Sequence, residues 1–153
     1  MYFKRIKITE LSTEKIESNV RLLSLRRHTS LDFKSASTYV AEPNKFFLGY
    51  ENDRKIDLLR IITPFERLLP KIIVTFDKTN FQEYKLRLKL ISMVSLILLT
   101  IGLIFNLVYS IQNGRLESDF GSIVIVNLIF YLLLFVEYKL VKRKMDLTLN
   151  WKE

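Results

Sequence analysis

Few residues of this 153-residue sequence are of the types that carry out chemistry. It contains no cysteine, which excludes disulfides, thiolate metal sites and cysteine nucleophiles. Its one histidine, His28, follows two arginines, and their positive charge disfavours a bound metal cation. The four glycines are scattered, so no glycine-rich phosphate loop is present, and no acidic pair has the local spacing of a metal site. We therefore expect a protein that is not an enzyme, with no catalytic residue, no metal and no cofactor.

The distribution of charge along the chain indicates a membrane protein. A formal net charge of +8 would suit a nucleic-acid binder if it were spread evenly. Instead, residues 1–89 carry 18 Lys or Arg against 11 Asp or Glu, residues 90–111 carry no charge, and residues 137–153 carry five Lys or Arg against three acids. The basic excess thus flanks an apolar block, as in membrane proteins. We expect no nucleic acid as a partner.

Two long apolar runs predict a transmembrane helical hairpin. Residues 90–111 are 22 uncharged residues, which as a helix would extend about 33 Å and cross the ~30 Å hydrocarbon core. Residues 120–136 form a second uncharged run, and we extend this span to 120–141 on the assumption that Glu137 is paired or reaches the interface. The linker, residues 112–119, is short and polar, so the two spans must be antiparallel neighbours.

The orientation of the hairpin follows from the positive-inside rule. Three basic residues precede the first span and four follow the second, whereas the linker holds only Arg115. We therefore expect the linker outside, both termini in the cytoplasm, and residues 142–153 as a cytoplasmic tail. The expected location is the bacterial cytoplasmic (inner) membrane, with the chain as a multi-pass protein.

Residues 1–89 read as one cytoplasmic α+β domain, an antiparallel sheet with one or two helices. Ser12 or Thr13 can cap a helix with apolar residues at 16, 20 and 23, which ends near His28. Residues 29–44 are polar and predict a loop or a weak edge strand. Alternating or apolar runs predict strands at residues 2–8, 45–50, 55–63, 71–77 and 84–90.

The last of these strands leads directly into the first span. Apolar residues at 84, 86, 88 and 90 alternate with Lys85, Arg87 and Lys89 in strict period two, with no glycine or proline before the helix. A junction of this kind would hold the sheet close to the membrane rather than on a flexible tether.

Polar residues at matched depth predict contacts between the two spans. Asn106 and Asn127 fall ~6 and ~9 Å below the same outer interface, so an interhelical hydrogen bond would fix the hairpin. Either asparagine could instead reach a partner subunit or hydrate near the interface. At the cytoplasmic end, Lys89 is at a broadly similar depth to Glu137 and is its expected partner.

The cationic residues around the spans have two interpretations. One is a positive-inside flank together with a solvated sheet face, and the other is contact with anionic lipid head groups. The residues that would make such contacts are Lys71, Lys78, Lys85, Arg87, Lys89, Lys142, Arg143 and Lys144.

Residues 46–90 carry a pattern that resembles small two-span bacterial membrane proteins of uncharacterised function. The pattern is a phenylalanine and a nearby glycine, an apolar strand with an arginine, an aromatic and a proline, and a strand that becomes the first span. The matching residues are Phe46 or Phe47, Gly49, Ile56, Leu58, Arg60, Ile61, Phe65, Pro70 and the run Leu86-Arg87-Leu88. The sequence departs from the pattern at Thr63-Pro64, where those proteins have polar residues. The resemblance implies one β-rich domain before the hairpin and implies no activity.

Three functions remain open at this point. The first is a non-enzymatic accessory or regulatory subunit of a membrane complex, acting at the cytoplasmic leaflet with a membrane protein partner or by self-association. The second is a membrane-surface module that binds or senses lipid. The third is an immunity-type protein that protects against a membrane-active toxin.

Overall fold

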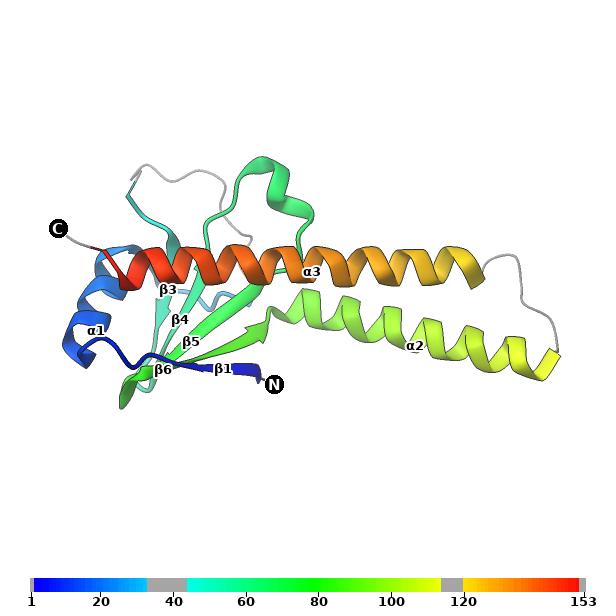
Figure 1. Cartoon of the computed structure of the whole chain (residues 1–153), viewed down its shortest axis with the longest axis horizontal. Coiled ribbons are helices and arrows are strands. Elements are labelled where there is room, and N and C mark those ends of the chain that lie inside the picture. Colours follow the sequence, from blue (N-terminus) through cyan, green and yellow to red (C-terminus); the bar gives the residue numbers. More distant parts are fainter. Residues whose placement is uncertain (1, 33–43, 114–119, 152–153) are drawn as a thin grey trace.

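The computed structural model describes residues 2–32, 44–113 and 120–151, and it combines one mixed sheet with two long helices (Figure 1). The predicted α+β domain followed by a two-helix hairpin is confirmed. Most of the predicted 29–44 loop and of the 112–119 linker lies outside the described residues. The elements are β1 Tyr2–Lys7, α1 Thr13–Leu22, β2 Ser24–Arg27, β3 Phe47–Glu51, β4 Lys55–Arg60, the 3₁₀ helix η1 Pro64–Leu68, β5 Ile72–Asp77, β6 Asn80–Leu88, α2 Leu90–Asn113 and α3 Phe120–Leu149.

The sheet has six strands in the order β1-β6-β5-β4-β3-β2. The neighbours β3, β4, β5 and β6 are antiparallel, as is β1 with β6, whereas β2 runs parallel to β3. The sheet is therefore mixed rather than wholly antiparallel. The first helix was predicted to continue to about His28, so it included the residues that form β2. This four-residue strand with two arginines has no apolar alternation, so its pairing with β3 decides its conformation.

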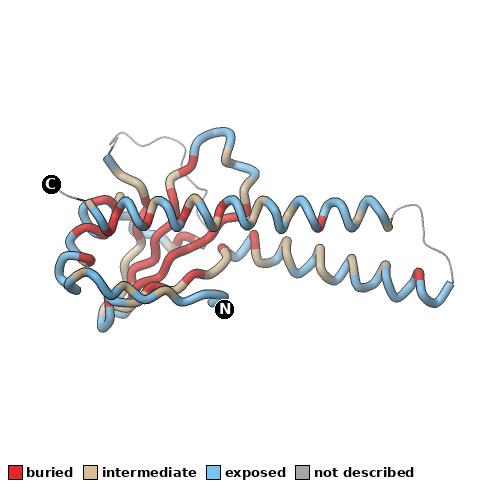
Figure 2. Tube along the Cα trace, in the orientation of Figure 1, coloured by how far each residue is buried: buried red, intermediate tan, exposed pale blue. Residues whose placement is uncertain are grey.

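The main hydrophobic core lies on the face of the sheet that α1 and the C-terminal half of α3 cover (Figure 2). Ile16 and Val20 of α1, predicted as its apolar positions, are fully buried there. Phe76 and Tyr84 contribute from the central strands, and their rings lie 5.6 Å apart. A smaller apolar cluster around Leu59 lies apart from this core.

Helix α3 is continuous over 30 residues and belongs to both halves of the molecule (Figure 1). Its first part lies beside α2, and its last part crosses the sheet. Val141, Met145 and Leu149 are buried in the main core, so residues 142–149 are not a separate tail. The buried side chain of Asn19 donates to the carbonyl of Leu149 at 3.2 Å and so satisfies one of the free carbonyls at the end of the helix.

Helices α2 and α3 are long and apolar enough to cross a membrane. A core helix of a soluble protein would be mostly buried, but only 6% of the most apolar 18-residue window of α2 is buried, and 11% of that of α3. Figure 2 shows this hairpin as largely exposed along its length. The apolar side chains of the hairpin therefore face the surroundings of the protein and not a protein core.

Strand β6 runs into α2 with only Lys89 between them. The backbone N–H of Lys89 still donates to the carbonyl of Lys71 at 2.8 Å, which extends the β5–β6 pairing by one step before the helix begins. The direct strand-to-helix junction that the alternating sequence predicted is thus present.

Candidate functional site

A group of buried charged side chains lies where the sheet meets the two long helices, and two of them form an ion pair. Arg60, at the end of β4, donates to both carboxylate oxygens of Glu137 on α3, with the shorter N–O distance 2.6 Å. Glu137 is 0% exposed and Arg60 is 3% exposed. Burial alone would lower the pKa of Arg60, but its hydrogen bonds with carboxylates outweigh burial and raise that pKa. The two hydrogen bonds between Arg60 and Glu137 connect α3 to the sheet.

A second carboxylate completes this cluster from the opposite side. Glu66 of η1 accepts from Arg60 at 2.9 Å and from the backbone N–H of Thr63 at 2.7 Å, which caps the short helix. The carbonyl of Glu66 accepts a hydrogen bond from the ammonium of Lys71 at 2.6 Å. The cluster thus joins β4, η1, the start of β5 and α3 through charged side chains.

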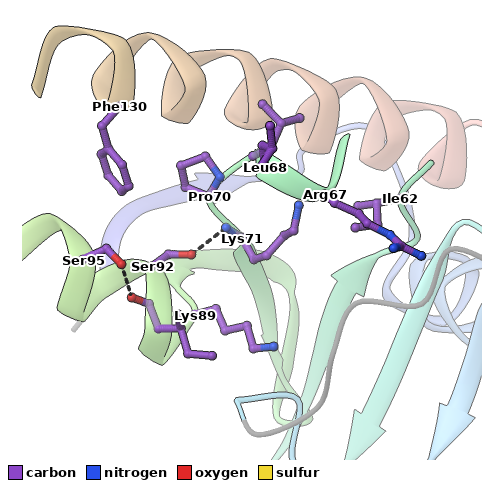
Figure 3. A pocket seen from close by; sticks show the side chains of 11 residues that line it. Ile62, Arg67, Leu68, Pro70, Lys71, Lys89, Ser92, Ser95 and Phe130 are labelled. Carbon is purple, nitrogen blue, oxygen red and sulfur yellow. Dashed lines mark hydrogen bonds between the residues drawn. The ribbon is translucent and has the colours of Figure 1, made fainter. Parts of the chain in front are cut away.

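A cavity of about 590 Å³ lies next to this cluster, at the start of the hairpin (Figure 3). Its walls come from the η1–β5 connection, the first turns of α2, and Phe130 of α3, whose ring points toward α2. The hydroxyl of Ser92 accepts a hydrogen bond from the backbone N–H of Lys71 at 2.8 Å, which ties α2 to β5. Ser95, one turn further along α2, also lines the cavity.

The cavity has a cationic end. Its described lining residues include Lys71, Lys89 and Arg67 and no carboxylate. Lys71 is 9% exposed and Lys89 is 4% exposed, and burial lowers the pKa of both ammonium groups. The charge of Lys89 further lowers the pKa of Lys71, while Glu137 acts in the opposite direction. Burial thus opposes the charge of both ammonium groups, whereas the carboxylate of Asp32 favours the charged form of Lys89.

The short helix η1, which contributes Arg67 and Leu68 to the cavity wall, carries exposed apolar side chains. Phe65 and Leu68 of η1 are 96% and 87% exposed, the highest values among the large apolar residues described. The connection from η1 to β5 stands out from the sheet beside α3, near the start of α2 (Figure 1). Large apolar side chains so exposed are typical of a surface that contacts a membrane or a partner.

The structure gives the predicted interhelical pairs different partners. The carboxylate of Glu137 is held by Arg60 instead of Lys89, because α3 lies against the end of β4. Asn127 is buried, but its side-chain amide donates to the carbonyl of Ile123 in its own helix at 2.9 Å. The side-chain oxygen of Asn106 is buried without a hydrogen-bond partner among the described residues. The described contacts therefore contain no Asn106–Asn127 hydrogen bond.

The predicted head-group residues fall into three places. Lys78 pairs with Glu51 at 2.7 Å beyond the end of β5, far from α2 along the sheet, and Lys85 pairs with Asp77 at 2.8 Å. Arg87 contacts two carboxylates, with its shortest N–O distance 2.8 Å. These three are engaged in ion pairs on the sheet. Residues 142–144 lie on the part of α3 that crosses the sheet, with Lys142 and Arg143 exposed and Lys144 over the ring of Phe46.

Of the predicted set, Lys71 and Lys89 line the cavity. Antiparallel pairing of Ile72 with Leu88 brings the backbones of Lys71 and Lys89 opposite each other, a relation that the position of a turn between the predicted strands at 71–77 and 84–90 could have revealed. Arg60 was named from the sequence only as part of the resemblance to two-span membrane proteins, with no role assigned to it. The site residues that the sequence did not indicate are Glu66, Arg67, Ser92, Ser95 and Phe130.

Comparison of the chain with protein-family models, with curated proteins and with solved structures gives no match in any of the three. The fold and the junction between sheet and hairpin therefore carry the functional interpretation.

Proposed function

We propose that this chain is a non-enzymatic integral membrane protein that acts as an accessory or regulatory subunit of a membrane complex. In this proposal α2 and α3 cross the bacterial cytoplasmic membrane, and the sheet and both termini lie on the cytoplasmic side. The observation that carries it is the continuity of α3, whose exposed apolar half leads without a break into a half that is buried in the core of the sheet domain.

The physical reason for proposing a regulatory role is the mechanical coupling between the hairpin and the sheet domain. A hairpin that served only as an anchor would need no fixed relation to the soluble domain, and a flexible linker would suffice. Here the two halves are joined twice, by the short β6–α2 junction and by α3 itself, and the Arg60–Glu137 pair lies at the crossing. A change in the packing of the hairpin against a partner would therefore move the sheet domain as one body.

The orientation can be tested by cysteine labelling, since the native chain has no cysteine. In intact cells, Asn113→Cys at the end of α2 should react with an impermeant maleimide. Lys142→Cys, on the sheet-bound part of α3, is the matched control and should react only in inverted vesicles. Recovery of the chain in the soluble fraction, or labelling of Asn113→Cys from the inside only, would refute the membrane orientation.

The regulatory role can be tested by uncoupling the two halves. Insertion of Gly-Ser-Gly between Val136 and Glu137 should leave the hairpin in the membrane but release α3 from its register on the sheet. We expect the native complex, seen as a stoichiometric assembly in mild detergent, to lose the partner or its regulation. The same insertion before Phe120, in the linker, is the control and should be tolerated. An assembly unaffected by both insertions would contradict the coupling role.

A further inference from the structure

The short helix η1 presents apolar side chains to the outside of the molecule. Phe65 and Leu68 are three residues apart, so they lie on one face of a 3₁₀ helix, which has three residues per turn. Their exposed fractions of 96% and 87% mean that they contribute almost nothing to either apolar core. Exposed apolar side chains grouped in this way form a surface that is suited to apolar surroundings.

The backbone around η1 satisfies several of its own hydrogen-bond donors. Pro64 and Pro70 have no N–H group. The N–H of Thr63 donates to the carboxylate of Glu66 at 2.7 Å, and the N–H of Glu66 donates to the carbonyl of Thr63 at 3.1 Å. The N–H of Leu69 donates to the carbonyl of Glu66 at 3.2 Å. A segment whose donors are paired within the chain loses little when it leaves water.

The acidic residue of η1 holds the helix on the sheet domain. The carboxylate of Glu66 accepts a hydrogen bond from Arg60 at 2.9 Å, and its carbonyl accepts one from the ammonium of Lys71 at 2.6 Å. The charge of Glu66 is thus engaged by the cluster at the end of β4, while Phe65 and Leu68 stay exposed. This arrangement makes η1 a preformed apolar projection with a fixed position on the domain.

The projection lies at the level where the apolar part of the hairpin begins. It stands beside α3, near the first turns of α2 (Figure 1). Leu68 lines the same cavity as Ile91 of α2 and Phe130 of α3. Ile91 and Phe130 belong to the two uncharged runs that are proposed to cross the membrane. The exposed apolar surface of η1 therefore continues that of the hairpin at its cytoplasmic end.

We infer that η1 is an interfacial anchor, whose Phe65 and Leu68 insert into the cytoplasmic leaflet of the bilayer that the hairpin crosses. This inference rests on the proposed function, because the hairpin must be in the bilayer for η1 to meet lipid. The sheet domain is then connected to the membrane at three places, the β6–α2 junction, α3 and η1. Three connections fix the tilt of the domain relative to the bilayer, which two along the hairpin alone would leave free.

The size of the projection favours a bilayer over a protein partner. Together Phe65 and Leu68 offer roughly 400 Å² of surface at most, about half of the ~800 Å² that each partner buries in a stable protein complex. Apolar side chains of interfacial anchors, in contrast, need to reach only ~5–10 Å into the boundary between head groups and acyl chains. The position of η1 beside the start of the hairpin matches this shallow depth.

Quenching of a single tryptophan by brominated lipid tests the inference in the full-length chain. Trp151→Phe removes the native tryptophan but keeps an aromatic ring near Phe46, and Phe65→Trp then places the only tryptophan on η1. The purified protein is reconstituted in phosphatidylcholine vesicles with or without bromine in the upper part of the acyl chains. Because an inserted side chain reaches ~5–10 Å into the boundary region, we expect brominated lipid to lower the emission about twofold.

The matched control is Leu147→Trp in the same Trp151→Phe background. Leu147 is exposed as well, but it lies on the part of α3 that crosses the sheet, so its emission should be the same in both lipids. Leu68→Trp should be quenched like Phe65→Trp, because the two side chains share one face of η1. All three variants should keep the thermal midpoint of Trp151→Phe in detergent, since each new tryptophan replaces an exposed side chain.

Two results would overturn the inference. One is an emission of Phe65→Trp that brominated lipid leaves unchanged, and the other is equal quenching of the control Leu147→Trp. If Phe65→Trp is unquenched in vesicles but its emission is blue-shifted in native membranes, η1 contacts a protein partner instead of lipid.

A tryptophan on the hairpin separates failure of the inference from failure of the proposed function. Leu98 is an exposed residue of α2, so Leu98→Trp in the Trp151→Phe background should be quenched if the hairpin is in the bilayer. Quenching of Leu98→Trp without quenching of Phe65→Trp refutes the anchor alone. Absence of quenching in both refutes the proposed membrane insertion and the anchor with it.

Discussion

Removing the carboxylate of Glu137 is the sharpest perturbation of the junction. In Glu137→Ala the guanidinium of Arg60, itself 3% exposed, would lose its 2.6 Å partner while staying buried. Removal of one partner of a buried ion pair typically costs about 3–5 kcal/mol. Glu66 still accepts from Arg60 at 2.9 Å, so we expect a loss in the free energy of unfolding near the lower end of that range, about 3 kcal/mol.

A double variant separates the loss of a contact from the cost of a stranded charge. Arg60→Met/Glu137→Leu replaces the pair with apolar side chains of similar length. Since well-packed apolar replacements of buried ion pairs are often neutral or stabilising, we expect the double variant to recover most of the stability that Glu137→Ala loses. Coupling between the two positions should therefore be several-fold larger than the ~0.5 kcal/mol typical of independent sites.

The single tryptophan provides the assay. The ring of Trp151 packs edge-on against Phe46, with ring centroids 6.0 Å apart, just beyond the end of α3. Its fluorescence should report the release of α3 from the sheet during denaturant titration in detergent. Asp146→Ala, which removes an exposed acid from the same helix, is the control and should change the free energy of unfolding by less than about 0.5 kcal/mol.

Two results would refute this reasoning. A cost below about 1 kcal/mol for Glu137→Ala would mean that the pair is screened like a surface salt bridge. A double variant less stable than Glu137→Ala would mean that the charges themselves, rather than the filling of the space, hold α3 in place.

Three further outcomes are expected. Met145→Ala should lower the free energy of unfolding by about 2–5 kcal/mol in the same titration, because the Met145 side chain is fully buried against the sheet. The control Leu147→Ala, at an exposed position of the same helix, should have little effect. Equal losses in the two variants would contradict the packing of α3 on the sheet. Asn106→Leu should leave hairpin stability unchanged or raise it, because the side-chain oxygen of Asn106 is buried without a described partner. A stability loss above about 0.6 kcal/mol in micelles would instead support the predicted hydrogen bond between the two helices. Hydrogen bonds from Arg21 and Lys78 lower the pKa of Glu51 to about 2 from an ordinary value of 4.5. The Glu51 carboxylate should therefore contribute about 1 kcal/mol of stability above pH 4.5, and this contribution should be lost as the pH falls from 4.5 through about 2. The difference between native protein and Glu51→Gln, measured by titration at each pH, should therefore shrink over that interval; a constant difference would exclude the carboxylate as its source.

Local patterns were sufficient to predict most elements of the fold. Strict alternation from residue 84 to residue 90 predicted β6 and its direct junction with α2, because both depend on neighbouring residues. The extent of α3 could not be read from hydrophobicity alone, since the apolar run ends at Val136. A signal was nevertheless present, as Val141, Met145 and Leu149 recur every four residues among charged side chains and mark one face of a helix.

The site was less predictable because its contacts join distant parts of the chain. Glu137 was expected to find a cation, and it does, but the partner Arg60 lies 77 residues earlier in the sequence. The expected depth of Lys89 in the membrane suggested it as the partner of Glu137, but an argument from depth could not show that β4 ends beneath α3. Lys71 and Lys89 meet through strand register, which a turn position and two strand lengths determine.

The continuity of α3 between hairpin and sheet is tested most directly by one distance measured in the full-length protein. Spin labels at Leu128→Cys and Leu147→Cys, both exposed positions, are separated by 19 residues of helix in a chain without native cysteine. At 1.5 Å per residue we expect one narrow distribution centred near a backbone separation of about 28 Å, in detergent and in lipid nanodiscs alike. A broad distribution, or a clearly shorter distance, would show that α3 breaks between the hairpin and the sheet and would contradict the coupling proposed for this protein.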